Sequence, residues 1–287
     1  MRRSSRKGDS HHKPHALTRE VLHKQWPRLH AGDREPFPDA AGLRRLEKKH
    51  AALGAWLDAE GGAGPVAEAL QEAWCEFHGG DFARAVRSGE RLGALGATVA
   101  NKAAAIESIN AGRDQARGGQ LLEAAVQRGE AAVSALPGYP NAHYTLALAL
   151  GRYSQRISIL TALAEGLATR VRAHLERTLE LEPRHAEAHI ALGLYHAEIV
   201  GKLGALMARL TYQVSADAAL KHFRRALELA PESPIAHIEY AQGLLLLDAR
   251  GNAAAARKLY AQAAGIDPAD AMERLDVGRA REHLVEE

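Results

Sequence analysis

Histidine is the residue type whose spacing most suggests chemistry in this chain of 287 residues, which contains 15 histidines. Three of them, His143, His189 and His237, follow an alanine at matching positions of similar segments, and the intervals are 46 and 48 residues. Imidazole nitrogens bind a metal at about 2.0–2.1 Å. Equivalent positions on stacked helices lie about 8–10 Å apart, so these side chains would not converge on one ion. We therefore interpret the three histidines as structural.

Three further histidines, His11, His12 and His15, lie in a basic N-terminal stretch without apolar periodicity. They could capture a metal, but nothing in the stretch would fix a second shell around the ligands. We predict that residues 1–15 form a disordered, basic, His-rich tail. Because no apolar segment follows its arginines, neither a secretory nor a twin-arginine signal is indicated, and we expect a cytoplasmic protein.

The other candidates for chemistry are a stripe of acids and one thiol. Glu68, Glu72 and Glu76 share a helical face by their spacing, which is typical of a solvated surface. Cys75 has no base beside it in the sequence, so we interpret it as a buried, inert thiol. The common nucleotide-binding and hydrolase motifs are also missing. We predict no catalytic residue, no cofactor, no metal ligand and no enzymatic activity.

The elements that carry these residues are predicted to be helices throughout. Alanine, the strongest helix former, makes up about a fifth of the chain, and β-branched residues are sparse. No run of about 18 apolar residues occurs, so we expect no membrane span. The net charge of +2 gives no global attraction to nucleic acid, and a single cysteine excludes an internal disulfide. We expect an all-α protein that binds no nucleic acid.

The N-terminal region, residues 16–64, is expected to form a helical extension. A first helix is predicted over residues 17–29, ended by Pro27, and a loop rich in glycine and proline follows. Asp39 can cap a second helix that carries one continuous stripe of leucines. The glycine-rich segment 60–65 marks the clearest boundary in the chain. We predict a helical repeat domain over residues 65–287.

Internal repeats organise this second region. Segments that begin at Pro140, Ala186 and Pro234 align with one another, and each is followed by a second segment that ends in a proline. An earlier pair of segments, around Gly89 and Gly129, matches at an interval of 40 residues. Repeats of such length indicate a solenoid, in which each unit buries its apolar face against the next.

These repeats resemble the tetratricopeptide repeat (TPR) family, whose unit is a helix–turn–helix of 34 residues. Gly193 and Ala219 match the family's small positions, and Phe223 matches its aromatic position. The resemblance covers about residues 66–268, and it implies a right-handed superhelical solenoid of antiparallel helix pairs. We expect about five units, with Gly193 facing Ala219 at a close helix crossing and a capping helix near residues 270–284.

Two units are longer than the family's, because their closing prolines lie 46 and 48 residues apart. The excess contains no proline, so we predict that the helices extend and project as two adjacent hairpins. Their apolar side chains exceed what mutual contact can bury, which marks a binding or self-association surface. The candidate hairpin residues are Ile159, Leu163, Leu203, Leu206, Met207 and Leu210.

The resemblance also implies a concave groove lined by the first helix of each unit. The lining residues would be Asn141, Tyr144, Leu148, Arg152, Glu187, Ile190, Leu194, Glu198, Ile235, Ile238, Gln242 and Leu246. Too few of them are Lys, Arg or Asn for the family's peptide-carboxylate clamp. We expect an apolar helix or extended peptide in the groove, unless the C-terminal helix or the N-terminal helices fill it.

One function is expected, and two alternatives remain. We expect a non-catalytic protein–protein interaction or scaffold protein that can form homo-oligomers through its hairpins. The first alternative is a binding protein for a small apolar ligand in a closed cavity between the hairpins, because the repeats also distantly resemble the subunits that accompany TRAP-type solute transporters. The second is an enzyme, which a compact cluster of buried acids with perturbed pKa values would favour.

Overall fold

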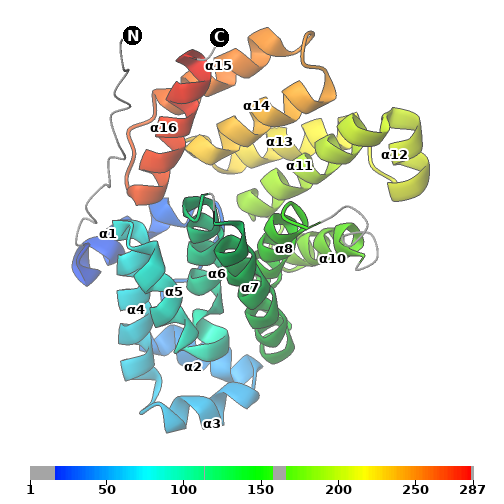
Figure 1. Ribbon diagram of the computed structural model, residues 1–287. Coiled ribbons are helices and arrows are strands. Elements are labelled where there is room, and N and C mark those ends of the chain that lie inside the picture. The colour runs from blue at the N-terminus through cyan, green and yellow to red at the C-terminus, as the bar shows by residue number, and fades with distance from the viewer. Residues whose placement is uncertain (1–16, 113, 158–165, 286–287) are drawn as a thin grey trace.

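The computed structural model describes residues 17–112, 114–157 and 166–285, and every regular element in these ranges is a helix (Figure 1). Three short helices come first: α1 (Arg19–Leu29), α2 (Ala40–Lys49) and α3 (Ala52–Ala59). The described residues then form five helix pairs, which are α4 (Ala63–Gly79) with α5 (Phe82–Glu90), α6 (Gly93–Asn110) with α7 (Gln115–Ala135), α8 (Pro140–Ser154) with α10 (Leu167–Leu181), α11 (Ala186–Leu203) with α13 (Ala216–Leu229), and α14 (Pro234–Leu247) with α15 (Ala253–Ala264). Helix α12 (Ala205–Tyr212) lies within the fourth pair, and α16 (Ala271–Val285) ends the chain. The predicted all-α repeat solenoid with a capping helix is confirmed.

Two of the repeat helices begin at a proline. Pro140 and Pro234 are the first residues of α8 and α14, where a missing backbone N–H breaks no helical hydrogen bond. The Ser233 hydroxyl accepts from the backbone N–H of Ala236 at 3.4 Å. None of the described helices is long and apolar enough to cross a membrane.

The aromatic position of the repeat lies between two glycines. Phe223 of α13 is fully buried, and its ring stacks on Tyr240 of α14 at 5.0 Å between centroids. A Cβ atom on Gly193 would lie 2.7 Å from this ring, and one on Gly243 would lie closer still. The nearest atoms to Gly193 thus belong to Phe223, and Ala219 lies in the same apolar cluster, one turn earlier on α13.

The N-terminal helices follow the prediction except in their leucine stripe. Helix α1 ends at Leu29 as predicted, and Pro27 lies in its last turn, where a proline removes only one helical hydrogen bond. Asp39 caps α2 as predicted, and its carboxylate accepts from the backbone N–H of Gly42 at 2.5 Å. The leucine stripe is divided between α2 and α3, because His50 leaves the helical conformation.

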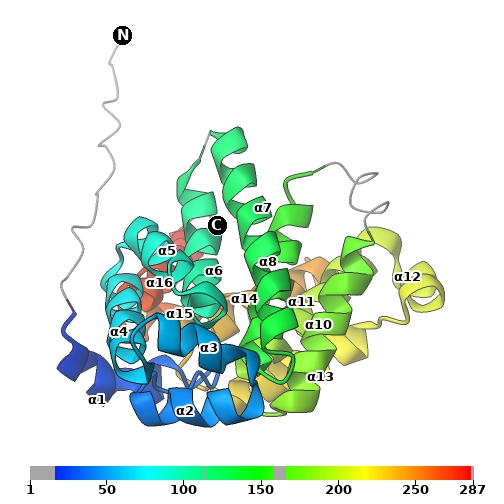
Figure 2. The ribbon, with the colours of Figure 1, turned by 90° about the horizontal axis from the view of Figure 1, so that it is seen from below.

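The prediction that the inserts simply lengthen the helices is wrong for the second insert. Helix α11 ends at Leu203 because Gly204 adopts φ 77° and ψ 155°, and α12 then runs as a separate helix. Ala208 of α12 is fully buried beside Val200 of α11, which holds the short helix against the solenoid. Figures 1 and 2 both show α12 at one extremity of the molecule. The first insert falls largely on residues 158–165, outside the described residues.

The two ends of the described chain meet. Arg28 of α1 donates to the backbone carbonyl of Asp267 at 2.7 Å and forms an ion pair with Glu273 of α16 at 3.3 Å. Ala271 of α16 shares one apolar cluster with Trp26 of α1 and Trp74 of α4. The N-terminal extension and the capping helix thus close the open side of the solenoid, as Figure 1 shows at its left edge.

Candidate functional site

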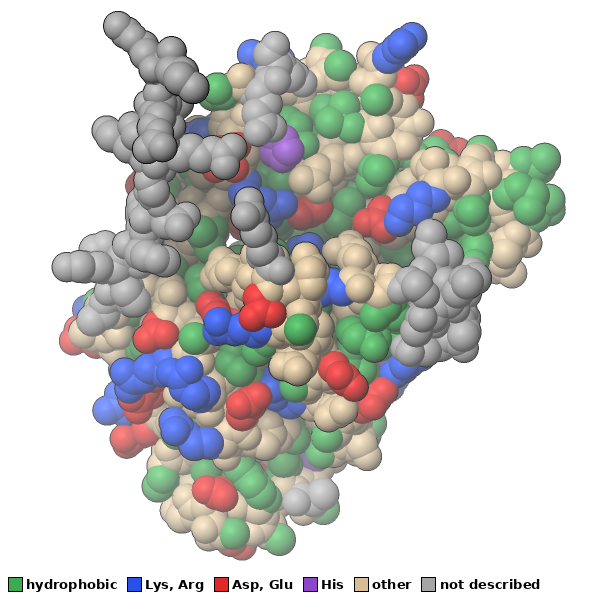
Figure 3. Space-filling view, viewed as in Figure 1, with side chains coloured by type: hydrophobic (Ala, Val, Ile, Leu, Met, Phe, Trp, Pro, Cys, Tyr) green, Lys and Arg blue, Asp and Glu red, His purple; other side chains and the backbone are tan. Residues whose placement is uncertain are grey.

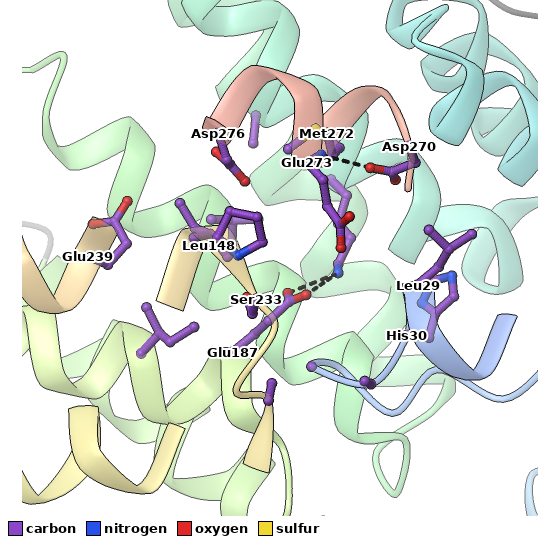
Figure 4. A pocket seen from close by; sticks show the side chains of 18 of the residues that line it. Leu29, His30, Leu148, Glu187, Ser233, Glu239, Asp270, Met272, Glu273 and Asp276 are labelled. Atoms are coloured by element: carbon purple, nitrogen blue, oxygen red, sulfur yellow. Dashed lines mark hydrogen bonds and ion pairs between the residues drawn. The ribbon is translucent and has the colours of Figure 1, made fainter. Parts of the chain in front are cut away.

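A cavity of about 590 Å³ lies on the concave face of the solenoid. Its walls come from the first helices of the units, α4, α6, α8, α11 and α14, which agrees with the predicted groove. Residues 28–32 and helix α16 lie across the groove, so one of the expected occupants, the chain itself, partly fills it. Figure 3 shows a hollow at the centre of this face with charged side chains around it, and Figure 4 shows part of the lining.

Seven of the predicted groove residues line the cavity, and they are Tyr144, Leu148, Arg152, Glu187, Ile190, Leu194 and Ile235. Five do not line it, namely Asn141, Glu198, Ile238, Gln242 and Leu246. Ile238 is fully buried in the core between α14 and α15, one position before the cavity residue Glu239. Asn141 is buried beneath the loop that follows α1.

Residues 30–35 form a turn that lies at one end of the groove. The backbone carbonyl of Gly32 accepts from the backbone N–H of Glu187 at 3.1 Å, and that of Asp33 accepts from the Asn141 amide at 3.1 Å. The indole N–H of Trp26 donates to the carbonyl of Glu35 at 2.8 Å, which anchors the segment to α1. These backbone contacts are of the kind that peptides make with a groove.

Lys102 of α6 is the central cation of this end. Its Nζ atom lies 2.5 Å from Asp33 Oδ2 and 2.9 Å from Glu187 Oε2. Burial by itself would lower the pKa of Lys102, but the two carboxylates raise it above its ordinary value. The pKa of Glu187 is raised, because burial outweighs the attraction of Lys102. Lys102 therefore stays charged and serves as an anchor for the segment, and it has no free lone pair for nucleophilic chemistry.

Two histidines connect the segment to α16. His30 Nδ1 lies 2.9 Å from Asp33 Oδ1, and the Nε2 atoms of His30 and His78 lie 3.1 Å apart. His78 Nδ1 donates to Asp270 Oδ2 at 2.7 Å. Burial lowers the pKa of His30 to about 4, against the opposing effect of the Asp33 carboxylate. This polar chain joins the end of α1 to α4 and α16 in the wall of the cavity.

A second buried acid lies behind the segment. Glu35 accepts from the Tyr139 hydroxyl at 2.7 Å and from the Asn141 amide at 2.5 Å. Burial, together with the neighbouring Asp33 charge, raises the pKa of Glu35 to about 8. His185 lies 2.8 Å from the Asn141 side-chain oxygen, and burial lowers the pKa of His185 to about 3.

The opposite end of the cavity holds two acids, Glu239 of α14 and Asp276 of α16, and each side chain is only 8% exposed. Arg279 of α16, with 39% of its side chain exposed, lies 3.8 Å from Glu239 and 3.4 Å from Asp276. Burial raises the pKa of Glu239, and it raises the pKa of Asp276 to about 7. Sequence analysis missed both residues and Lys102, although Glu239 follows the predicted core position Ile238 directly.

The three repeat histidines lie at the starts of their helices. The Nδ1 atom of His143 lies 3.1 Å from that of His174, and the Nδ1 atom of His189 lies 2.8 Å from that of His222. Burial lowers the pKa of both His143 and His189. Within the described ranges no group of three or more side chains is arranged to hold a metal ion.

The remaining candidates lie away from the cavity. Cys75 is buried as predicted, and burial raises the pKa of its thiol to about 11. Ile159 and Leu163 fall outside the described residues. The other four hairpin residues are exposed at the end of α11 and on α12, with exposed fractions of 46% for Leu203, 71% for Leu206, 55% for Met207 and 70% for Leu210. Figure 3 shows hydrophobic side chains gathered on this protrusion.

Comparisons with known proteins support the fold. A family model described as "RMD1-3: Regulator of microtubule dynamics protein 1-3" matches residues 97–284, which run from α6 to α16. No curated protein matches the chain. Among solved structures, a thermophilic TPR protein of Thermus thermophilus matches with a TM-score of 0.53 and 18% sequence identity, over 76% of this chain and 99% of that one. The described chain is a TPR-like helical repeat protein.

Proposed function

The chain belongs to the family of regulator of microtubule dynamics proteins 1-3, and we propose that it is a non-catalytic interaction protein whose concave cavity takes a short segment of a partner protein. TPR-like solenoids are typically interaction modules and not enzymes. The family's name suggests a partner connected with microtubule dynamics.

The cavity is the observation that carries this proposal. A helix with its side chains is about 10–12 Å across, so one turn occupies on the order of 500 Å³. The cavity of about 590 Å³ therefore has room for one turn of helix or a short extended segment. Most of the exposed surface of its walls is apolar, and charged side chains stand among the apolar ones, where they can fix the orientation of a ligand.

Peptide selection against a blocked cavity tests the proposal. Ala191 lines the cavity, so Ala191→Trp would fill it, whereas Ala254 is exposed on α15 and Ala254→Trp is the matched control. A displayed peptide library would be selected on the wild-type chain. We expect the selected peptides to bind Ala254→Trp normally and to bind Ala191→Trp at least about tenfold more weakly. Peptides that bind both variants equally, or a selection that yields none, would contradict the proposal.

The alternative function, binding of a small apolar ligand, is best tested at the same cavity. The apolar side chains of α12 are exposed, whereas the cavity on the concave face has the size that drug-sized ligands need.

Acid–base catalysis is a second candidate function, because Glu239 and Asp276 are buried acids with raised pKa values in the cavity wall. This function would require that the chain turn over a substrate, that Asp276→Asn abolish the reaction, and that the exposed variant Glu228→Gln keep it. A panel of ester, amide and glycoside substrates would measure this.

A further inference from the structure

The end of the cavity between α14 and α16 contains a pair of acids with few hydrogen-bond donors and cations beside them. Glu239 and Asp276 both line the cavity, and only 8% of either side chain is exposed. In Figure 4 they come from different helices, and the Asp276 carboxylate points into the cavity. The two acids are 37 positions apart in the chain, so the fold and not local sequence brings them to one wall.

The hydrogen bonds of these two acids are incomplete. Among the described residues, Glu239 accepts no hydrogen bond, and its nearest cation, Arg279 Nη2, lies 3.8 Å away. Asp276 accepts one long hydrogen bond, from Arg279 Nη1 at 3.4 Å. Arg279 is partly exposed at the rim and is shared between both acids. A buried carboxylate without donors costs free energy, so both groups favour a ligand that supplies donors.

The lining as a whole carries more acidic than basic side chains, so its charge has the same sign as the Glu239 and Asp276 pair. Six acids and four Lys or Arg side chains line the cavity. Two of the cations are already paired with acids of the lining, because Lys102 is held by Glu187 and by Asp33, and Arg28 pairs with Glu273. Arg152 is the remaining cation of the lining besides Arg279. An anionic ligand would meet net repulsion, and a cation would meet two carboxylates.

The neighbouring wall is aliphatic. Ile235 lies one turn before Glu239 on the same face of α14, and Leu148, Ile190 and Leu194 add to the lining from α8 and α11. A hydrated metal ion would gain nothing from this wall, and no group of three metal ligands is present in the described ranges. An aliphatic stem that ends in a charged nitrogen would contact both surfaces.

We propose that the α14–α16 end of the cavity binds an organic cation, an ammonium or guanidinium group on an aliphatic stem, with Glu239 and Asp276 accepting its N–H groups. The group can come from a Lys or Arg side chain of a partner segment or from a free alkylamine, since both present the same chemistry. The inference deepens the proposed function and rests on it, because it names the chemistry that this cavity recognises.

Calorimetry on the full chain tests the proposal with three small probes: n-octylammonium, octanoate and octanol. We expect n-octylammonium to bind, and octanoate and octanol to bind at least about tenfold more weakly. Glu239→Gln and Asp276→Asn should each weaken n-octylammonium at least about tenfold. Glu228→Gln changes the net charge equally at an exposed position of α13, and it should leave the affinity unchanged. Thermal melts would verify that all variants fold.

A second arm separates the two sources of the cation. Lysine-containing peptides selected on the wild-type chain would be compared with the same peptides carrying norleucine, which keeps the stem and loses the charge. Loss of affinity on this change, also seen with Glu239→Gln, supports a side chain of a partner, whereas binding of n-octylammonium alone supports a free amine. The proposal is overturned if octanoate binds as tightly as n-octylammonium, or if both acid variants keep full affinity for every cation. Selected peptides that still distinguish Ala191→Trp from Ala254→Trp would leave the proposed function standing in that case.

Discussion

Phe223 fits between two helices because each of them presents a glycine to its ring. A side chain at Gly193 would overlap a ring that is fully buried and cannot move aside. We expect Gly193→Leu to lower the free energy of unfolding by about 1–3 kcal/mol or more. Gly151 of α8 has open space around its Cβ position, so Gly151→Ala should raise that free energy by about 0.5–1 kcal/mol. Urea unfolding of the two variants measures both, and equal midpoints would exclude this packing.

Lys102 is the residue whose charge the buried Asp33 requires. Asp33 is fully buried, so removing its cation leaves an uncompensated charge. We expect Lys102→Met to lower the free energy of unfolding by about 3–5 kcal/mol. The exposed pair of Lys202 and Glu198 is the control, and Lys202→Met should change it by less than about 1 kcal/mol. Adding Asp33→Asn to Lys102→Met should recover part of the loss, and a double variant as unstable as the single one would argue against the charge as the cause.

At the scale of the element, α12 carries apolar side chains that nothing in the described chain covers. Leu206, Met207 and Leu210 are each more than half exposed. We expect this surface to mediate self-association, because contiguous exposed apolar patches mark interfaces. Changing all three to serine should keep the melting temperature and reduce the mass in light scattering toward the 30.9 kDa of one chain.

The control for α12 is a pair of exposed leucines elsewhere, Leu246 and Leu275, changed to serine. That variant should associate as the wild type does. If the wild-type chain has the mass of one copy at every concentration, self-association through α12 is contradicted.

The elements show what a local pattern can and cannot predict. Small residues, a buried aromatic and closing prolines recur at fixed intervals, so the sequence alone predicts the helix pairs. Gly204 carries no such signal, because glycine is tolerated inside helices and its positive φ is selected by the packing of Ala208. By contrast, Pro27 is a local signal that the structure bears out, because it lies in the last turn of α1, two residues before the helix ends at Leu29.

At the scale of the molecule, buried ionisable groups should set the pH dependence of stability. The folded pKa values of His30 and His222 are lowered to about 4, chiefly by burial. The unfolded chain therefore binds more protons below about pH 6.5, and the free energy of unfolding should fall as the pH drops from 6.5 toward 4. Glu35 and Asp276 have folded pKa values of about 8 and 7. Their contribution to the free energy of unfolding should therefore decline as the pH rises through these values.

Urea unfolding between pH 5 and 8 measures this profile. Changing His143 and His189 to phenylalanine removes two histidines whose pKa values are lowered by burial, so the acid limb should become shallower. The limb above pH 6.5, which depends on the acids, should stay unchanged and serves as the internal control. Parallel acid limbs in the wild type and the double variant would reject the assignment.

Most of the cavity lining could not be predicted from the periodicity of the sequence, because the contacts that build it do not recur from one repeat to the next. Lys102 meets Asp33 across 69 residues and Glu187 across 85 residues. The repeat pattern predicted the seven lining positions on α8, α11 and α14, since those follow helical spacing. It contained no information on which side chains residues 28–32 and α16 would bring to the open side, since each of these elements occurs once.

The meeting of the two chain ends constrains how this architecture can change in length. An open array of repeats tolerates the gain or loss of a unit, because each unit contacts only its neighbours. Here Arg28 reaches partners 239 and 245 residues away, and His78 reaches Asp270 across 192 residues. One additional helix pair would separate these partners by about 8–10 Å for each helix inserted, which breaks every contact between the ends. Duplication of a unit, the usual way in which solenoids become longer, would therefore require this chain to lose the contacts between its two ends.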